Sequence, residues 1–365
     1  MSEKQIHNLI YPLIQIYSQI EIEMILELAE WFMKNNELGG TMEWYIDQLH
    51  DMGFFTQENI KLLNRYSGRT TTDINKMLRN AGRGTLEELN RTNPIRVYAS
   101  QKHRSIIKSA VHEVEDIMQL INTNALESLK REYIQILTQA YIETSSGLYS
   151  YDESIKKAIF KLVDNGISGS TYLRQGKEVN FSLEATVRRD VITKTRQLGG
   201  ELTLNNCHEL DINTVLVSSH YGARVDTKDP INDHQSWQGK VYMIDGFDNK
   251  YGNLYTQTGY GQLLGLLGVN CRHNFKPFIE GATMIPDKKD IDKNEQIYKL
   301  EQYQRGLERK IRQDKKNQIV AKKFDDEIAL ERYKNLEKKH YEELRQFTSE
   351  YEELTLDYSR TQIYS

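Results

Sequence analysis

The chain has 365 residues, more than one hydrophobic core commonly serves, so we expect two or three structural units. Only 38% of the residues are hydrophobic and 27% are charged, a balance typical of long amphipathic helices with much exposed surface. The net charge of −4 argues neither for nor against a nucleic-acid partner, so any such signal must come from local clusters.

The number of cysteines and the hydropathy pattern indicate in which cellular compartment the protein folds. Two cysteines cannot form a disulfide framework, and their scarcity agrees with folding in a reducing cytoplasm. The N-terminus lacks a basic region followed by an apolar run, and no stretch approaches the ~18 uninterrupted apolar residues of a membrane span. We therefore expect a soluble, untargeted protein without a membrane partner.

The first ~195 residues are predicted to be nearly all α-helical. Apolar residues that recur every three or four positions predict a first helix to about Lys34, which Gly39–Gly40 would end. The same periodicity predicts a helix over 100–143.

Short helices joined by tight turns are expected between these two. Thr56 is placed to cap a helix through Leu63, and Thr71 or Thr72 to cap another that stops near Gly82.

A smaller module with strands follows. Ser182 is placed to cap a helix that Gly199–Gly200 would end. The β-branched segment 211–219 and the segment 239–244 each predict a strand. A glycine-rich stretch over 250–268 is expected to turn tightly over this small β core.

The C-terminal part is charged and has helical periodicity. Its loose heptad-like stripe is rich in tyrosine, which predicts a long helix or helical hairpin that packs on the N-terminal helices or on another subunit. The fold class is therefore α+β. We expect a helical region over 1–180, a small glycine-rich α/β module over 181–285 and a charged helical tail over 286–365.

Uncommon residue types concentrate in three strings of the module, SSHYGAR (218–224), HQSWQGK (234–240) and GVNCRH (268–273). Loops that flank a small sheet tend to converge at its ends, so we expect the side chains that could carry chemistry to cluster in space. These are His220, His234, Trp237, Cys271 and His273.

Two interpretations of these residues stay open. His220, His234, Cys271 and His273 have side chains that bind zinc, but their spacings match no standard zinc module. Histidines near strand ends more often hydrogen-bond to backbone carbonyls, and Trp237 favours burial in a core or at an interface.

An enzyme is the less favoured alternative. The histidines together with Arg224, Arg272 and Lys240 could form a nuclease or phosphotransfer site. No carboxylate pair in the strings would hold magnesium, although Asp245 and Asp248 are near in sequence. The arginines fit better as partners for backbone carbonyls or carboxylates.

The three strings, with 180–189 before them and Pro277–Phe278 after them, resemble the phage minor capsid protein 2 family. The resemblance is strongest over 180–315. One departure is Val225, where the family usually has proline. The matching positions are His220, Gly222, Arg224, His234, Trp237, Gly239, Asn270, Cys271, Arg272 and His273.

This resemblance implies a minor capsid protein for head morphogenesis in a tailed bacteriophage. Such a protein lies in the virion, at the portal vertex or capsid interior, and in the host cytoplasm during assembly. Its implied partners are the portal protein, the major capsid protein or both, and it would aid head assembly and DNA packaging or ejection. The resemblance implies no catalytic role. We expect no cofactor other than the structural zinc considered above. The alternatives are a metal-dependent nuclease or toxin-like enzyme that uses the His/Cys cluster, and a plain DNA-binding accessory factor.

A basic segment extends from Lys299 to Lys323, with nine basic and three acidic residues and a net charge of +6. It predicts weak, sequence-independent contact with packaged DNA, and the alternative is a solvated helix face. The side chains expected to be exposed for this contact are Arg309, Lys310, Arg312, Lys315 and Lys316.

Overall fold

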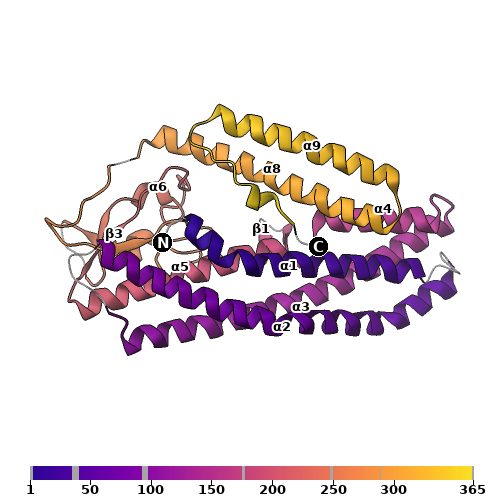
Figure 1. Ribbon diagram of the computed structural model, residues 1–365, viewed down its shortest axis with the longest axis horizontal. Coiled ribbons are helices and arrows are strands. Elements are labelled where there is room, and N and C mark those ends of the chain that lie inside the picture. The colour runs from indigo at the N-terminus through magenta and orange to yellow at the C-terminus, as the bar shows by residue number, and fades with distance from the viewer. Residues whose placement is uncertain are drawn as a thin grey trace. The chain divides into compact units, whose positions relative to one another are not determined.

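The computed structural model describes residues 3–34, 41–92, 98–174, 177–246, 250–287 and 289–363 (Figure 1). Contacts divide the chain into two compact units, each built from three stretches of sequence. Unit 1 consists of Met1–Pro12, Thr71–Ile117 and Arg188–Tyr303. Unit 2 consists of Leu13–Thr70, Met118–Val187 and Gln304–Ser365. The secondary structure is mostly helical with small sheets, so the predicted α+β class is confirmed.

The first helix, α1 (Glu3–Lys34), is the one that the apolar spacing predicts. Its predicted end at Gly39–Gly40 lies outside the described residues. In the part of the chain that the structure describes, no helix is long and apolar enough to cross a membrane. The predicted apolar stripe is buried at Ile6, Leu13, Ile16, Ile20, Met24 and Leu28.

Helix α2 (Met42–Thr92) is continuous over 51 residues, so the prediction of short capped helices is wrong. The Thr56 hydroxyl does not cap a new helix, because it donates to the Met52 carbonyl one turn earlier, at 2.8 Å. Gly82 does not end a helix either. A Cβ at this position would lie 2.6 Å from Cδ1 of Ile107, so the glycine permits close helix packing in unit 1.

Helix α3 (Gln101–Ser145) confirms the next predicted helix. Helix α4 (Tyr151–Asn165) then begins with a capping box, in which Ser150 and Glu153 bond each other's backbone N–H.

An antiparallel hairpin of β1 (Ser168–Arg174) and β2 (Lys177–Ser182) follows α4. The sequence analysis does not predict this hairpin, whereas most of the other described residues up to about 195 are helical, as expected. Most described side chains of the hairpin are at least partly exposed, so no strong apolar alternation marks these strands in the sequence.

Helix α5 (Leu183–Glu209) starts where predicted, with the Ser182 hydroxyl accepting from the Ala185 N–H at 3.3 Å. It does not end at Gly199–Gly200 but continues through them. In unit 1 a Cβ on Gly200 would lie 2.4 Å from Cδ1 of Leu267. Gly200 thus lets the helix pack closely on the segment that carries Leu267 instead of ending the helix.

A four-stranded sheet in the order β5-β4-β3-β6 forms the centre of the module. Strands β3 (Thr214–Val217) and β4 (Val241–Met243) lie within the two predicted strand segments. The outer strands are β5 (Gly252–Asn253) and β6 (Phe275–Pro277). Two short helices, α6 (His234–Trp237) and α7 (Leu254–Thr258), complete it. The core beneath the sheet includes Cys207, Val215, Val217, Trp237, Tyr242, Leu266 and Cys271.

The tail is helical, as predicted, and consists of α8 (Ile291–Lys323), α9 (Glu327–Glu350) and a final 3-10 turn, η1 (Tyr358–Thr361). Helices α8 and α9 run antiparallel (Figure 1). Within unit 2 they share a core of Leu307, Ile311 and Leu344. The expected packing on an N-terminal helix is also present in this unit, where Lys323 Nζ lies 2.6 Å from Glu30 Oε2 on α1.

Candidate functional site

The sheet of unit 1 brings the three motif loops to one end. Strands β3 and β6 are antiparallel with Val217 opposite Phe275, so the residues after β3 lie beside those before β6. Strand β4 pairs with β3 through Val241 and Leu216, which places the residues before β4 at the same end. Strand pairing therefore gathers side chains that are far apart in sequence.

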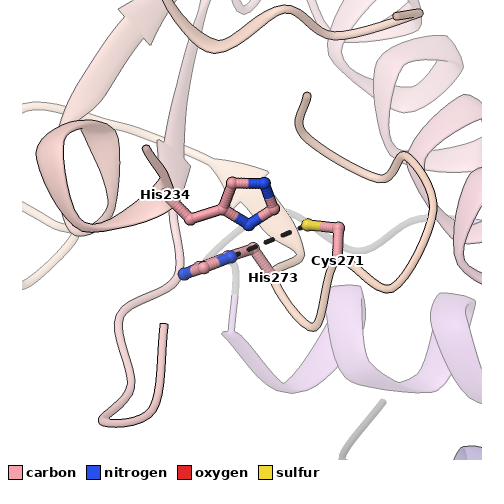
Figure 2. Close-up of side chains that lie close together, drawn as sticks. All are labelled: His234, Cys271 and His273. Carbon is pink, nitrogen blue, oxygen red and sulfur yellow. Dashed lines mark hydrogen bonds between the residues drawn. The ribbon is translucent and has the colours of Figure 1, made fainter. Parts of the chain in front are cut away.

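The five side chains predicted to cluster do so. The rings of His220 and His273 stack with centroids 4.2 Å apart. The Trp237 ring lies 4.9 Å from that of His273 and 4.5 Å from that of His234. Cys271 Sγ lies 3.6 Å from His273 Nδ1 (Figure 2). All except His220 are at most 2% exposed.

Hydrogen bonds fix the tautomers of the two buried histidines. His234 Nε2 lies 2.9 Å from the Leu264 carbonyl, which can only accept, so Nε2 carries the hydrogen. His273 Nε2 lies 3.1 Å from Gln238 Oε1, which also accepts from the His220 N–H at 3.0 Å. Nδ1 of each ring therefore carries a lone pair instead of a hydrogen. Figure 2 shows Nδ1 of His234 turned toward Cys271 and His273.

Burial keeps His234, Cys271 and His273 uncharged near neutral pH. It lowers the pKa of His234 to about 4, although the hydrogen bond to Leu264 opposes this shift. Burial, reinforced by neighbouring positive groups, lowers the pKa of His273 well below its ordinary value. It raises the pKa of the Cys271 thiol. The site thus presents neutral imidazoles and a thiol, not a reactive thiolate.

Arg272, in the loop before β6, forms hydrogen bonds with the turn at Gly222 and with α8. Its Nη1 donates to Glu301 Oε1 at 2.9 Å and its Nη2 to the Gly222 carbonyl at 2.7 Å. Gly222 has a φ of +75°, and a Cβ there would lie 2.5 Å from Arg272 Nη2. The glycine is thus required both by its backbone conformation and by the guanidinium beside it.

The other motif residues also have structural contacts. Arg224 donates to Asn232 Oδ1 at 2.5 Å and to the Val269 carbonyl at 3.0 Å. Trp237 is a core residue whose Nε1 donates to the Ile231 carbonyl at 3.1 Å. Backbone turns with positive φ occur at Gly239 (φ 68°) and Asn270 (φ 60°).

The structure reduces the predicted metal set. Among the described residues, the group of mutually close donor atoms consists of His234, Cys271 and His273. His220 is not in this group, because its ring stacks on His273 and its Nδ1 lies 2.8 Å from the Tyr221 carbonyl.

Two residues that the sequence does not single out complete the site. Gln238 bridges His220 and His273, and its only sequence signal is its place in the HQSWQGK string. Asn294 on α8 accepts from the Ala223 N–H and donates to its carbonyl, both at 2.9 Å. Asn294 lies beyond the motifs, where no local pattern marks it.

The predicted DNA-contacting residues of α8 lie in unit 2 and differ in exposure. Arg309 and Lys310 are exposed, as expected. Lys316 is only 8% exposed, and its Nζ lies 2.5 Å from Glu21 Oε2 and 3.5 Å from Glu184 Oε2. The expectation that Lys316 is exposed is therefore wrong, because carboxylates on α1 and α5 neutralise it inside the unit.

Arg312 and Lys315 are also withdrawn from solvent. Arg312 Nε lies 3.3 Å from Glu184 Oε1, and the Arg312 side chain is 16% exposed. Lys315 Nζ donates to the Thr361 carbonyl at 3.0 Å, and its side chain is 17% exposed. Burial by itself lowers the pKa of Lys316, but Glu21 and Glu184 outweigh it and raise this pKa, so the ammonium stays charged.

Comparison with known proteins gives the chain its family. It matches the model of the family described as phage minor capsid protein 2 over residues 1–349. A protein of Lactococcus phage LL-H named "Structural protein" is 25% identical over 344 residues, which cover 87% of this chain and 88% of that protein. Another "Structural protein", from Lactococcus phage mv4, is 32% identical over 119 residues, covering 32% of this chain and 95% of that protein. No solved structure matches. Because the family match spans almost the whole length, the chain belongs to the phage minor capsid protein 2 family, as its motifs predict.

Proposed function

We propose that this chain is a minor head component of a tailed bacteriophage virion, held at the portal vertex or on the inner capsid surface. There it contacts the portal protein, the major capsid protein or both, and aids head assembly and DNA packaging or ejection. The observation that carries the proposal is the family match over residues 1–349, joined to phage relatives named as structural proteins.

The geometry of the module supports a structural role for the His/Cys cluster. His234, Cys271 and His273 are at most 2% exposed, so a phosphodiester could not reach them without opening of the fold. This burial disfavours the alternative of a metal-dependent nuclease or toxin-like enzyme. Of the two carboxylates that are near in sequence, Asp245 is exposed.

Peptide mass spectrometry of gradient-purified virions tests the location, and amine-reactive cross-linking of the same particles tests the partners. Lys310 is exposed and should form cross-links to portal or major capsid peptides. Lys316 is an internal control: its buried ion pairs with Glu21 and Glu184 should keep it unreactive in the folded chain.

The expected result is the chain in intact particles at low copy number, with cross-links to head proteins. A portal gene immediately upstream of its reading frame would agree. Presence in the lysate but absence from purified virions would overturn the proposal. Cross-links confined to tail proteins would overturn the location in the head.

A further inference from the structure

We propose that unit 1 binds a transition-metal ion, zinc in the first place, through His234, Cys271 and His273. The donor atoms of these side chains all lie within 4.8 Å of one another. One cysteine sulfur and two imidazole nitrogens form a mixed donor set that suits zinc. The inference does not depend on the proposed place in the head, since it rests on these three side chains alone.

The separation of the donors fits a zinc site. Zinc lies about 2.3 Å from a cysteine sulfur and about 2.0–2.1 Å from a histidine nitrogen, so at a tetrahedral angle these atoms are about 3.5–3.6 Å apart. Cys271 Sγ and His273 Nδ1 are 3.6 Å apart. The sulfur and nitrogen could therefore share an ion without large movement. A thiol–imidazole hydrogen bond has a similar length, so metal analysis must separate the two.

The surroundings orient both histidines as metal ligands. A ligating imidazole commonly donates its other N–H to a carbonyl or carboxylate, which fixes the ring and its tautomer. His234 does so to the Leu264 carbonyl and His273 to Gln238 Oε1. Each Nδ1 lone pair is thereby left for the space beside Cys271 (Figure 2).

Burial assigns the ion a structural role. His234 belongs to α6, whereas Cys271 and His273 precede β6. One ion would therefore connect α6 to the loop before β6 at the end of the sheet. On binding, Zn²⁺ displaces the thiol proton of Cys271 to solvent, and the two neutral imidazoles release none. No electron is transferred. Three protein donors leave the fourth position of a tetrahedral ion open, as in catalytic sites, but the burial of all three side chains keeps a substrate from reaching it, so the role would be structural.

The experiment measures metal bound to the full-length chain, purified without a histidine tag and dialysed against micromolar zinc. We expect about one zinc per chain by elemental analysis. Replacement by Co²⁺ should give the visible bands of a tetrahedral ion and a near-ultraviolet thiolate-to-cobalt band. Cys271→Ser should lose the ultraviolet band and most of the metal. The matched control is Cys207→Ser, since Cys207 is also buried in this core but lies outside the donor group.

The outcomes separate the two accounts of the cluster. Stoichiometric metal and the thiolate band in the natural chain and in Cys207→Ser support the site. Absence of both from the natural chain overturns it and leaves a hydrogen-bonded core. Equal metal in Cys271→Ser and the natural chain also overturns it. If Cys271→Ser fails to fold, the cobalt spectra of the natural chain and of Cys207→Ser decide.

Discussion

Gly222 illustrates how one residue can hold a motif loop in place. Its φ of +75° belongs to the left-handed region, and its missing side chain leaves room for the Arg272 guanidinium. The same guanidinium reaches Glu301 on α8, with Nη2 2.8 Å from Glu301 Oε2. The turn, the loop before β6 and the start of α8 therefore depend on one position without a Cβ.

We predict that Gly222→Ala lowers the free energy of unfolding of unit 1 by more than the cost of a left-handed backbone alone. A left-handed alanine costs about 1–3 kcal/mol, and overpacking against Arg272 adds typically about 1–3 kcal/mol. Gly246→Ala is the matched control, because Gly246 has nearly the same φ, +74°, and a Cβ there would meet no neighbouring group within 4 Å. Urea unfolding of both variants measures the difference. Equal losses would show that the contact with Arg272 is unimportant.

The sequence predicts which motif residues lie close together but not which other residues form hydrogen bonds and ion pairs with the motif loops. The clustering of His220, His234 and His273 could be predicted, because loops at the ends of a small sheet converge. The partners Asn294 and Glu301 could not, since both belong to a charged helix in which they look like ordinary surface residues. Their roles arise from tertiary packing, which no local pattern encodes.

Among the elements of unit 2, α8 is joined to α1 and α5 by a buried charge network around Lys316. Lys316 faces both Glu21 and Glu184, and Glu21 Oε1 also accepts from the Leu183 N–H at 3.2 Å. Removing one member of such a network leaves a buried charge without compensation, which typically costs about 3–5 kcal/mol.

We therefore predict that Lys316→Met lowers the free energy of unfolding by about 3–5 kcal/mol. Lys310→Met, six residues earlier on the exposed side of the helix, should change it by no more than about 0.5 kcal/mol. Adding Glu21→Gln to Lys316→Met should recover part of the loss, because the orphaned carboxylate is then neutral. Denaturant unfolding provides the test, and similar losses in the two lysine variants would refute the network.

A second contact between α1 and α8 should make stability depend on pH. Hydrogen bonds from Lys323 and Lys34 lower the pKa of Glu30 to about 2, below its ordinary value of 4.5. Because the folded-state pKa is depressed, the contribution is complete above about pH 4.5 and disappears as pH falls toward 2. Glu30→Gln should therefore flatten the loss of stability in this window, by an amount that high salt reduces.

Glu27 on the same helix provides a control of opposite sign. Burial raises the pKa of Glu27, although Arg65 opposes this shift. The folded state thus takes up this proton more readily than the unfolded chain does, and Glu27→Gln should steepen the loss on acidification. Thermal unfolding between about pH 7 and pH 3 compares the variants. If both glutamines changed the acid slope in the same direction, the assignment for Glu30 would be wrong.

Helix periodicity predicts α1 and α3 well, but helix ends are predicted poorly. A threonine or glycine can mark the end of a helix or can lie inside a longer one, and the sequence does not distinguish these two roles. Thr56 satisfies its hydroxyl on the preceding turn instead of capping, and Gly82 and Gly200 permit close contacts with Ile107 and Leu267. For the two glycines, the packing partner that decides between these roles is distant in sequence.

At the scale of the whole molecule, the basic residues that are consecutive in the sequence do not form one exposed basic surface. The basic run from Lys299 to Lys323 has a net charge of +6, yet part of it neutralises carboxylates on α1 and α5. Of the five residues expected to contact DNA, Arg309 and Lys310 are the exposed ones. A DNA-binding surface on this face of unit 2 would therefore be smaller than the sequence predicts.

We predict that the full chain binds duplex DNA weakly, without sequence preference and with a shallow salt dependence. Two phosphate contacts give a slope of log affinity against log salt of about −1.8, whereas five would give about −4.5. Between about 50 and 200 mM salt the affinity should then fall roughly 12-fold. Fluorescence anisotropy with two duplexes of unrelated sequence measures both properties.

The variants for this test carry equal charge changes. Arg309→Glu with Lys310→Glu should abolish binding, because it reverses the two exposed cations of α8. Lys338→Glu with Lys339→Glu reverses two adjacent exposed cations of α9 and should leave most of the affinity. Equal losses in the two double variants would mean that overall charge, not this surface, governs binding. A slope near about −4.5 would mean that Arg312, Lys315 and Lys316 leave their carboxylate and carbonyl partners to reach phosphates, at a cost in the stability of unit 2.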